Sequence, residues 1–257
     1  KKNYSQVYPN LIKIYLRNKQ FDQALGTAQE WEDLESTAIA YYYIGVAHDS
    51  LESPDKAISS FSKAISIQNN FVQGYISKSR AELKLDRLSD AYSDINKALS
   101  YDKNNVEAFI LKSEIGVAKN DFPNAINDIS RAIVIEPENV ELYQKRGLYN
   151  MKFSQYANAI ADFNKMIILQ KDNPEGYYYR AQANAETGNI EHAISDYQRF
   201  EELSPGVAGL DIEIEDAKKQ LYELNKESNN PELILTNPKT KGLNLNISKG
   251  SEMVLVS

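Results

Sequence analysis

The chain has 257 residues but no cysteine, and its only histidines are His48 and His192. Without cysteine it can form no disulfide, no thiolate metal site and no cysteine nucleophile. The two histidines stand too far apart in the sequence to show metal-ligand spacing. The 11 glycines form no phosphate-binding or dinucleotide-binding loop, and no Gly-x-Ser-x-Gly sequence occurs. We therefore expect no catalytic, metal-binding or cofactor-binding residues in this sequence.

Long apolar runs and an excess of positive charge are also missing. No apolar stretch approaches the roughly 18 residues that a membrane span requires. The formal net charge is -7, whereas proteins that bind nucleic acid carry basic surfaces that displace counterions from phosphates. We therefore expect no membrane insertion and no nucleic-acid partner.

The N-terminus carries neither an initiator methionine nor the apolar run of a signal peptide, since the chain opens with Lys1, Lys2, Asn3 and Tyr4. This start predicts a processed chain or a fragment of a larger one. The lack of cysteine suits an exported bacterial protein, and the abundance of Asn, Lys, Ile and Tyr suggests an AT-rich genome. These features favour the bacterial cell envelope but leave the compartment unknown.

A fixed repeat period runs through most of the sequence. Alanines recur every 34 positions, at Ala57, Ala91, Ala125, Ala159 and Ala193, and Ala24 extends the series one position short. An aromatic residue stands 16 positions before each: Tyr8, Tyr41, Tyr75, Phe109, Tyr143 and Tyr177. A small residue stands 12 positions before the last five: Gly45, Ser79, Ser113, Gly147 and Ala181. A period of this length predicts a stacked array of small structural units.

Each unit shows the apolar spacing of two helices of about a dozen residues. In the unit that starts at Val140, the two helical segments are separated at Phe153-Ser154-Gln155. Clusters of turn-forming residues, such as Glu136-Pro137-Glu138-Asn139, separate one unit from the next. Each unit is therefore predicted to be a helical hairpin in which the small residue and the alanine let the two helices cross closely.

These residues resemble the tetratricopeptide repeat family, which has an aromatic at position four, a small residue at position eight and alanine at position twenty. The resemblance implies an all-α, right-handed superhelical solenoid of six repeats over residues 5–207. After it, Leu210, Ile214, Ala217, Leu221 and Leu224 predict an amphipathic capping helix at 208–226. Residues 227–257 contain three short alternating or β-branched runs, which predict an extended or β segment. This segment is interpreted as the start of a truncated second domain or as a tail that docks on the array.

A second pattern links position seven of the last four repeats to position twenty-three. Cations at Lys78, Lys112, Arg146 and Arg180 are each followed 16 positions later by Asp94, Asp128, Asp162 and Asp196. The second repeat instead has Ile44 and Ser60 at these positions. Because the hairpin brings the two positions together, we predict one structural ion pair within each of these four repeats.

The family resemblance implies that the first helices line a concave groove for a partner. Transferring the groove positions gives a mixed apolar and charged set: Tyr42, Tyr43, Val46, Ile76, Arg80, Ile110, Glu114, Lys145, Leu148, Lys152, Tyr178 and Gln182. Such a surface suits an extended peptide or a helix. Some family members hold carboxylate tails with Lys and Asn in the first repeat, Asn in the second, and Lys and Arg in the third. This sequence does not match that clamp, because its positions hold Pro9, Lys13, Tyr43, Gln73 and Ser77. A chaperone-tail adaptor is therefore disfavoured.

Three functional hypotheses remain. The first is a non-catalytic protein-interaction scaffold that binds a peptide or helix in the groove. The second makes the array the regulatory or recognition arm of an enzyme whose catalytic domain lies beyond residue 257. The third is self-association by end-to-end stacking of arrays. On the first hypothesis, replacing Tyr42 and Tyr178 with alanine is expected to weaken partner binding with little loss of thermal stability.

Overall fold

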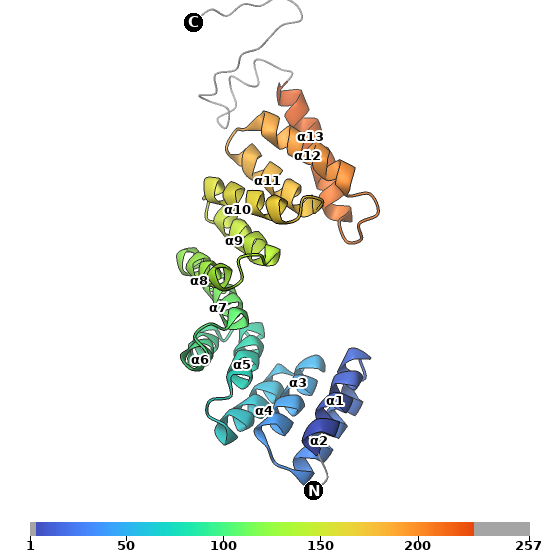
Figure 1. Ribbon diagram of the computed structural model, residues 1–257, viewed down its shortest axis with the longest axis vertical. Coiled ribbons are helices and arrows are strands. Elements are labelled where there is room, and N and C mark those ends of the chain that lie inside the picture. Colours follow the sequence, from blue (N-terminus) through green and yellow to red (C-terminus); the bar gives the residue numbers. More distant parts are fainter. Residues whose placement is uncertain (1–3, 229–257) are drawn as a thin grey trace, which may run out of the picture. The chain divides into compact units, whose positions relative to one another are not determined.

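The protein was analysed as a computed structural model, which describes residues 4–228. Within that range the chain forms thirteen α-helices and no strand (Figure 1). The helices are α1 Tyr4–Arg17, α2 Phe21–Leu34, α3 Ala38–Ser50, α4 Pro54–Ile67, α5 Val72–Lys84, α6 Leu88–Tyr101, α7 Val106–Ala118, α8 Phe122–Ile135, α9 Val140–Lys152, α10 Tyr156–Leu169, α11 Pro174–Glu186, α12 Ile190–Leu203 and α13 Asp211–Ser228. From α5 to α12 each helix begins one full repeat period after its counterpart in the preceding hairpin, as the sequence predicts.

The turn inside each hairpin contains one residue with a left-handed backbone. Its φ is 52° at Glu52, 57° at Asp86, 60° at Asn120, 57° at Ser154 and 77° at Gly188, so the conformation recurs once in every repeat period. This conformation ends the first helix and reverses the chain, and glycine alone adopts it without steric cost. Four of these five repeats use another residue there, so the turn geometry is imposed by the packing of the two helices.

The small residue of each repeat lies where its two helices cross. A Cβ atom added to Gly45 of α3 would lie 2.5 Å from Cε1 of Phe61 in α4. At the equivalent position in the next repeat, the Ser79 hydroxyl donates a 2.7 Å hydrogen bond to the carbonyl oxygen of Ala91. The periodic alanines, from Ala57 to Ala193, are completely buried. The predicted close helix crossing is therefore confirmed.

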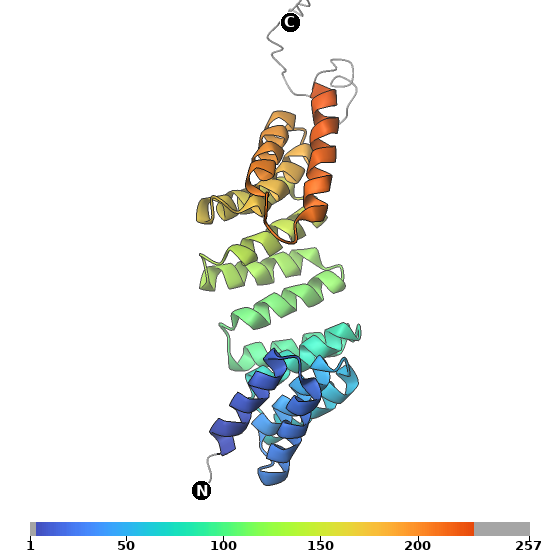
Figure 2. The same cartoon turned by 90° about the vertical axis from the view of Figure 1, so that its right-hand side faces the viewer.

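The chain divides into two compact units, residues 1–142 and residues 143–257. In the first unit, consecutive helices from α1 to α8 pack against one another (Figures 1 and 2). Its core includes clusters built around Trp31, Phe61 and Ile95, and Ile129 of α8 is also fully buried. In the second unit, α10 to α13 pack in sequence around a cluster that includes Tyr197 and Phe200.

The helix that follows the sixth hairpin covers its last apolar residues. Leu210, Ala217 and Leu224 are buried in one cluster with Tyr178 of α11 and Phe200 of α12. This is the predicted capping helix, but α13 begins at Asp211 and continues to Ser228. The predicted extended or β segment is therefore helical in its first two residues. The rest of that segment, residues 229–257, lies outside the described residues.

None of the helices described between residues 4 and 228 combines the length and the apolar character that a membrane-spanning helix needs.

Candidate functional site

The four predicted ion pairs are present inside their hairpins. Each cation on the first helix contacts the aspartate on the second: Lys78 and Asp94 at 2.6 Å, Lys112 and Asp128 at 3.3 Å, Arg146 and Asp162 at 2.6 Å, and Arg180 and Asp196 at 2.6 Å. Burial raises the pKa of Asp128, and it raises that of Asp162 although Arg146 opposes the shift. These carboxylates are occupied inside the fold, so the pairs are structural rather than part of a binding surface.

Sequence reasoning missed a third polar residue that joins these pairs. The side-chain amides of Asn150 and Asn184 donate hydrogen bonds to Asp162 and Asp196, at 3.1 Å and 3.3 Å respectively. Each asparagine stands four positions after the arginine of its repeat, and this helical spacing is the signal that could have revealed it. At the equivalent position of the third repeat stands Glu82, a carboxylate where the later repeats have an amide.

In the first unit, side chains from adjacent first helices meet on one face. Lys84 of α5 lies 2.7 Å from Asp49 of α3, and Arg80 of α5 lies 2.8 Å from Glu107 of α7. Gln73 of α5 also donates to Glu107, at 3.4 Å. We call this surface the first-helix face, and it comprises Tyr42, Val46, Asp49, Gln73, Ser77, Arg80, Lys84, Glu107, Ile110 and Glu114.

The charged groups of the first-helix face remain partly open to solvent. Arg80 and Glu107 each have 43% of their side-chain surface exposed, and Lys84 has 50%. Val46, Ile110 and Glu114 on the same face are half-buried. Such a surface offers apolar contacts beside exposed charges of both signs, which is the composition of many protein interfaces.

Two residues assigned to the groove in the first unit are inaccessible. Ile76 is 0% exposed, in a cluster with Ile95 of α6 and Leu111 of α7. Tyr43 is 9% exposed and its ring lies 6.2 Å from that of Trp31. Each first helix packs against the neighbouring hairpins. Some of the residues that the sequence assigned to the groove are therefore buried in that packing. These two side chains present no surface to a partner.

Tyr42 is half-buried in a group of aromatic rings. Its ring lies 5.4 Å from that of Tyr43, 5.8 Å from that of Phe61 and 5.4 Å from that of Phe71. Burial raises the pKa of its hydroxyl, against hydrogen bonds with Ser77 and Gln73 that lower it. Tyr42 therefore joins α3 to α5, and its role in packing is larger than the sequence indicated.

In the second unit, Tyr178 is buried by the capping helix. It is 7% exposed, its ring lies 5.1 Å from that of Phe200, and its hydroxyl donates a 2.9 Å hydrogen bond to Oδ2 of Asp216. Asp216 is the sixth residue of α13, and Ser77 is the sixth residue of α5. The capping helix α13 therefore contacts α11 at the same helix position at which α5, the first helix of the following hairpin, contacts α3. Of the other predicted groove residues in this unit, Lys145, Leu148 and Gln182 are half-buried and Lys152 is exposed.

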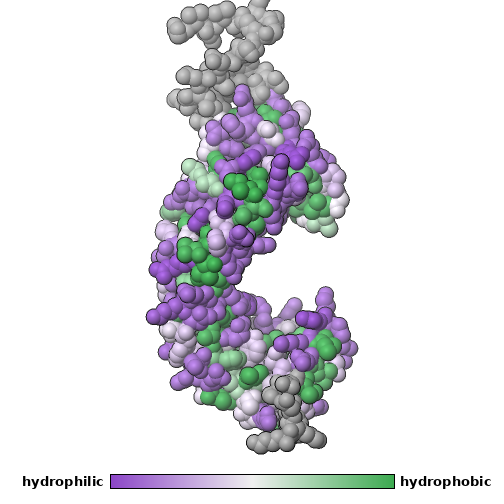
Figure 3. Space-filling model, in the orientation of Figure 1, coloured by the Kyte–Doolittle hydropathy of each residue, from purple (hydrophilic) through white to green (hydrophobic). Residues whose placement is uncertain are grey.

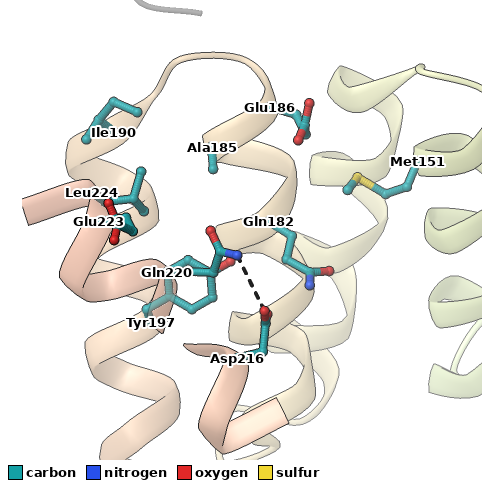
Figure 4. Close-up of a pocket in the computed structure, with 10 residues that line it drawn as sticks. All are labelled: Met151, Gln182, Ala185, Glu186, Ile190, Tyr197, Asp216, Gln220, Glu223 and Leu224. Atoms are coloured by element: carbon teal, nitrogen blue, oxygen red, sulfur yellow. Dashed lines mark hydrogen bonds between the residues drawn. The ribbon is translucent and has the colours of Figure 1, made fainter. Parts of the chain in front are cut away.

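A pocket of about 420 Å³ opens between α11, α12 and α13 (Figure 4). It is lined by Met151, Gln182, Ala185, Glu186, Ile190, Tyr197, Asp216, Gln220, Glu223 and Leu224. Only Gln182 belongs to the groove set predicted from sequence. The part of the wall on α13 was missed because this helix begins later than the repeat period would place it, so its register could not be transferred from the repeats. The other lining residues belong to α9, α11 and α12 and lie outside the transferred groove set.

In the view of Figure 3 the surface is mostly hydrophilic, and the apolar side chains gather in small, separated areas. Among the residues that the structure describes, no group of His, Asp and Glu has the arrangement of a metal site.

Comparisons with known proteins agree with the repeat architecture. Residues 38–71 and 145–208 match family models described as tetratricopeptide repeat. The fold is similar to the C-terminal part of a repeat-containing protein from Cytophaga hutchinsonii, with a TM-score of 0.74 and 19% identity over 90% of this chain and 97% of that one. No curated protein sequence matches the chain.

Two further solved structures share the fold. PilF from Pseudomonas aeruginosa has a TM-score of 0.68 and 14% identity, over 87% of this chain and 97% of that one. YrrB, described as a TPR protein with an unusual peptide-binding site, has a TM-score of 0.60 and 16% identity, over 75% of this chain and 97% of its own. With family models matched in both halves and the repeat period continuing between them, the chain carries tetratricopeptide repeats.

Proposed function

We propose that this protein is a non-catalytic scaffold that holds a segment of a partner protein against the first-helix face. The observation that carries the proposal is the arrangement of α3, α5 and α7: α5 contacts both α3 and α7, and the three helices place charges of both signs around half-buried apolar side chains. A surface of this kind suits an extended segment or an amphipathic helix, which needs apolar anchors and polar partners along one line. The likeness to YrrB, itself described as having a peptide-binding site, supports the same class of function.

The charge pattern favours a protein partner over nucleic acid. Within the first-helix face, Arg80 and Lys84 are paired with Glu107 and Asp49. A phosphate backbone would have to displace these carboxylates from a chain whose net charge is already -7. A polypeptide can instead exchange its own charged groups with the existing pairs while its apolar side chains reach Val46 and Ile110.

The proposal is tested by removing two cations from the first-helix face. Arg80→Ala combined with Lys84→Ala removes exposed side chains whose pairs each contribute about 1 kcal/mol or less to stability. The control is Lys103→Ala combined with Arg131→Ala, which removes two exposed cations outside this face. Each full-length variant is immobilised and used to capture proteins from a native lysate, which are quantified by mass spectrometry.

We expect a captured partner whose yield falls at least about fivefold with the face variant and stays constant with the control. Circular dichroism of both variants verifies that the helices are intact. Equal recovery of every captured protein by the wild-type chain and the face variant would refute the assignment of this surface.

A further inference from the structure

The pocket beside the capping helix is large enough to receive a side chain of a partner. Its volume is about 420 Å³, and its walls come from α9, α11, α12 and α13 of the second unit. Figure 4 shows Met151, Gln182 and Glu186 on one side of the pocket and Glu223, Leu224 and Ile190 on the other, with Tyr197 between them. Both aliphatic and polar side chains therefore line the pocket.

Tyr197 supplies a polar group that faces this pocket from a buried side chain. The residue is 1% exposed, lines the pocket, and its hydroxyl has no hydrogen-bond partner among residues 4–228. Because this hydroxyl opens on the pocket, a ligand bound there can form a hydrogen bond with it. Burial raises the pKa of this hydroxyl, and the charges of Asp216 and Glu186 raise it further, so the group is neutral at physiological pH.

The pocket is also acidic. Glu186, Asp216 and Glu223 line it, while none of its ten lining residues is a lysine, an arginine or a histidine. Asp216 accepts hydrogen bonds from Tyr178 at 2.9 Å and from Gln220 at 3.4 Å, both of which are neutral donors. Asp216 and Glu223 therefore give this wall negative charge, and no cation is among the residues that line the pocket.

We propose that this pocket receives a lysine or arginine side chain of a partner protein. The cationic head would lie among Asp216, Glu223 and the Tyr197 hydroxyl, which can accept a hydrogen bond from it. The aliphatic stem would contact Met151, Ala185 and Leu224, which match its apolar character. This inference rests on the proposed scaffold function and adds to it the class of residue that the second unit selects.

The test is a titration of the isotope-labelled full-length chain, followed by NMR, with four capped tripeptides of sequence Leu-X-Leu in which X is Lys, Arg, Leu or Glu. We expect the Lys and Arg peptides to shift the side-chain amide resonances of Gln182 and Gln220, and the Leu and Glu peptides to bind these sites at least about fivefold more weakly. Equal shifts with the Leu or Glu peptide would overturn the proposal, because they would show that the pocket does not select a cation.

Two substitutions probe the pocket without removing a contact seen in the fold. Glu223→Gln and Tyr197→Phe should each weaken binding of the Lys peptide by about threefold or more. The matched controls are Glu215→Gln, on an exposed side of the same helix, and Tyr222→Phe, whose ring is 67% exposed. Unchanged affinity in both pocket variants would overturn the proposal.

The chain carries its own lysines beyond the described residues, at Lys239 and Lys241. In the absence of peptide, a full-length variant with Lys239→Gln and Lys241→Gln should leave the Gln182 and Gln220 resonances unchanged. A shift of these resonances would show that the chain itself fills the pocket, and would overturn its assignment to a partner.

The two proposals can fail separately. If the tripeptides do not bind but partner capture still depends on Arg80 and Lys84, the pocket assignment alone is refuted. If the Lys and Arg peptides bind but capture is independent of the first-helix face, the scaffold assignment of that face is refuted while the pocket remains a cation site.

Discussion

Glu82 lies 3.3 Å from Lys78, a lysine that also holds Asp94 at 2.6 Å. The third repeat therefore places two carboxylates on one cation inside the hairpin. Glu82 is only 3% exposed, and its Oε2 atom is buried with no hydrogen-bond partner in the described part of the chain. Burial, reinforced by the charge of Asp94, raises the pKa of Glu82 from 4.5 to about 7.

The raised pKa of Glu82 predicts that the free energy of unfolding falls as pH rises. Because the pKa of Glu82 is higher in the folded chain than in the unfolded chain, its ionisation between pH 4.5 and about 7 costs the folded state free energy. Glu82→Gln, which keeps the shape of the protonated acid, should stabilise the protein by about 1–3 kcal/mol near pH 8 and by little near pH 4. Urea unfolding at the two pH values measures the difference.

The exposed Glu30 of α2 provides the control for this substitution, since Glu30→Gln removes a carboxylate that makes no buried contact. Its effect should be small at both pH values. A Glu82→Gln variant that is no more stable than the wild type at the higher pH would show that the buried carboxylate is better solvated than its surroundings indicate.

The Arg180 pair predicts a large cost for losing one partner and a smaller cost for losing both. Arg180→Ile leaves Asp196, which is 6% exposed, with the single amide of Asn184 at 3.3 Å. An unpaired buried carboxylate of this kind should destabilise the fold by about 2–4 kcal/mol. Adding Asp196→Ser reproduces the natural pair Ile44 and Ser60 of the second repeat and should restore part of that loss.

The exposed pair of Arg87 and Asp55 serves as the comparison for this series. Arg87→Ile should cost about 1 kcal/mol or less, because water replaces the lost partner. Urea unfolding of the three variants checks the order. Equal losses for Arg180→Ile and Arg87→Ile would contradict a structural role for the buried pair.

The repeat positions of this protein could be predicted from its sequence, whereas its open surface could not. Ala57 and its counterparts, the turn residues and the four ion pairs recur with the repeat period, so one hairpin predicts the others. Whether a side chain on the first helix of a hairpin is exposed to solvent depends instead on which helix packs over it. Ile76 and Tyr178 are covered by neighbouring helices, and in the second case that helix, α13, lies outside the repeat and begins out of its register.

Replacing glycine with alanine is expected to have opposite effects on stability at Gly45 and at Gly26. In Gly45→Ala the new methyl group would lie 2.5 Å from Cε1 of Phe61, so the ring or the helix has to move, at a cost of about 1–3 kcal/mol. In Gly26→Ala nothing lies within 4 Å of the new atom, and the helix α2 should gain about 0.5–1 kcal/mol. Thermal unfolding followed by circular dichroism should therefore move in opposite directions, and a parallel shift would contradict the close crossing of α3 and α4.

The position of Tyr178 changes the outcome expected from sequence, which was loss of binding without loss of stability. Its ring is buried between α11, α12 and α13, so Tyr178→Ala should destabilise the protein by about 3–5 kcal/mol. Tyr178→Phe keeps the ring and removes only the hydrogen bond to Asp216, which should cost about 1–2 kcal/mol. Tyr222→Phe on the exposed side of α13 is the matched control and should cost nothing measurable. If Tyr178→Ala unfolds at the same urea concentration as the wild type, α13 does not hold this tyrosine in solution, and the pocket that α13 completes would lose its wall.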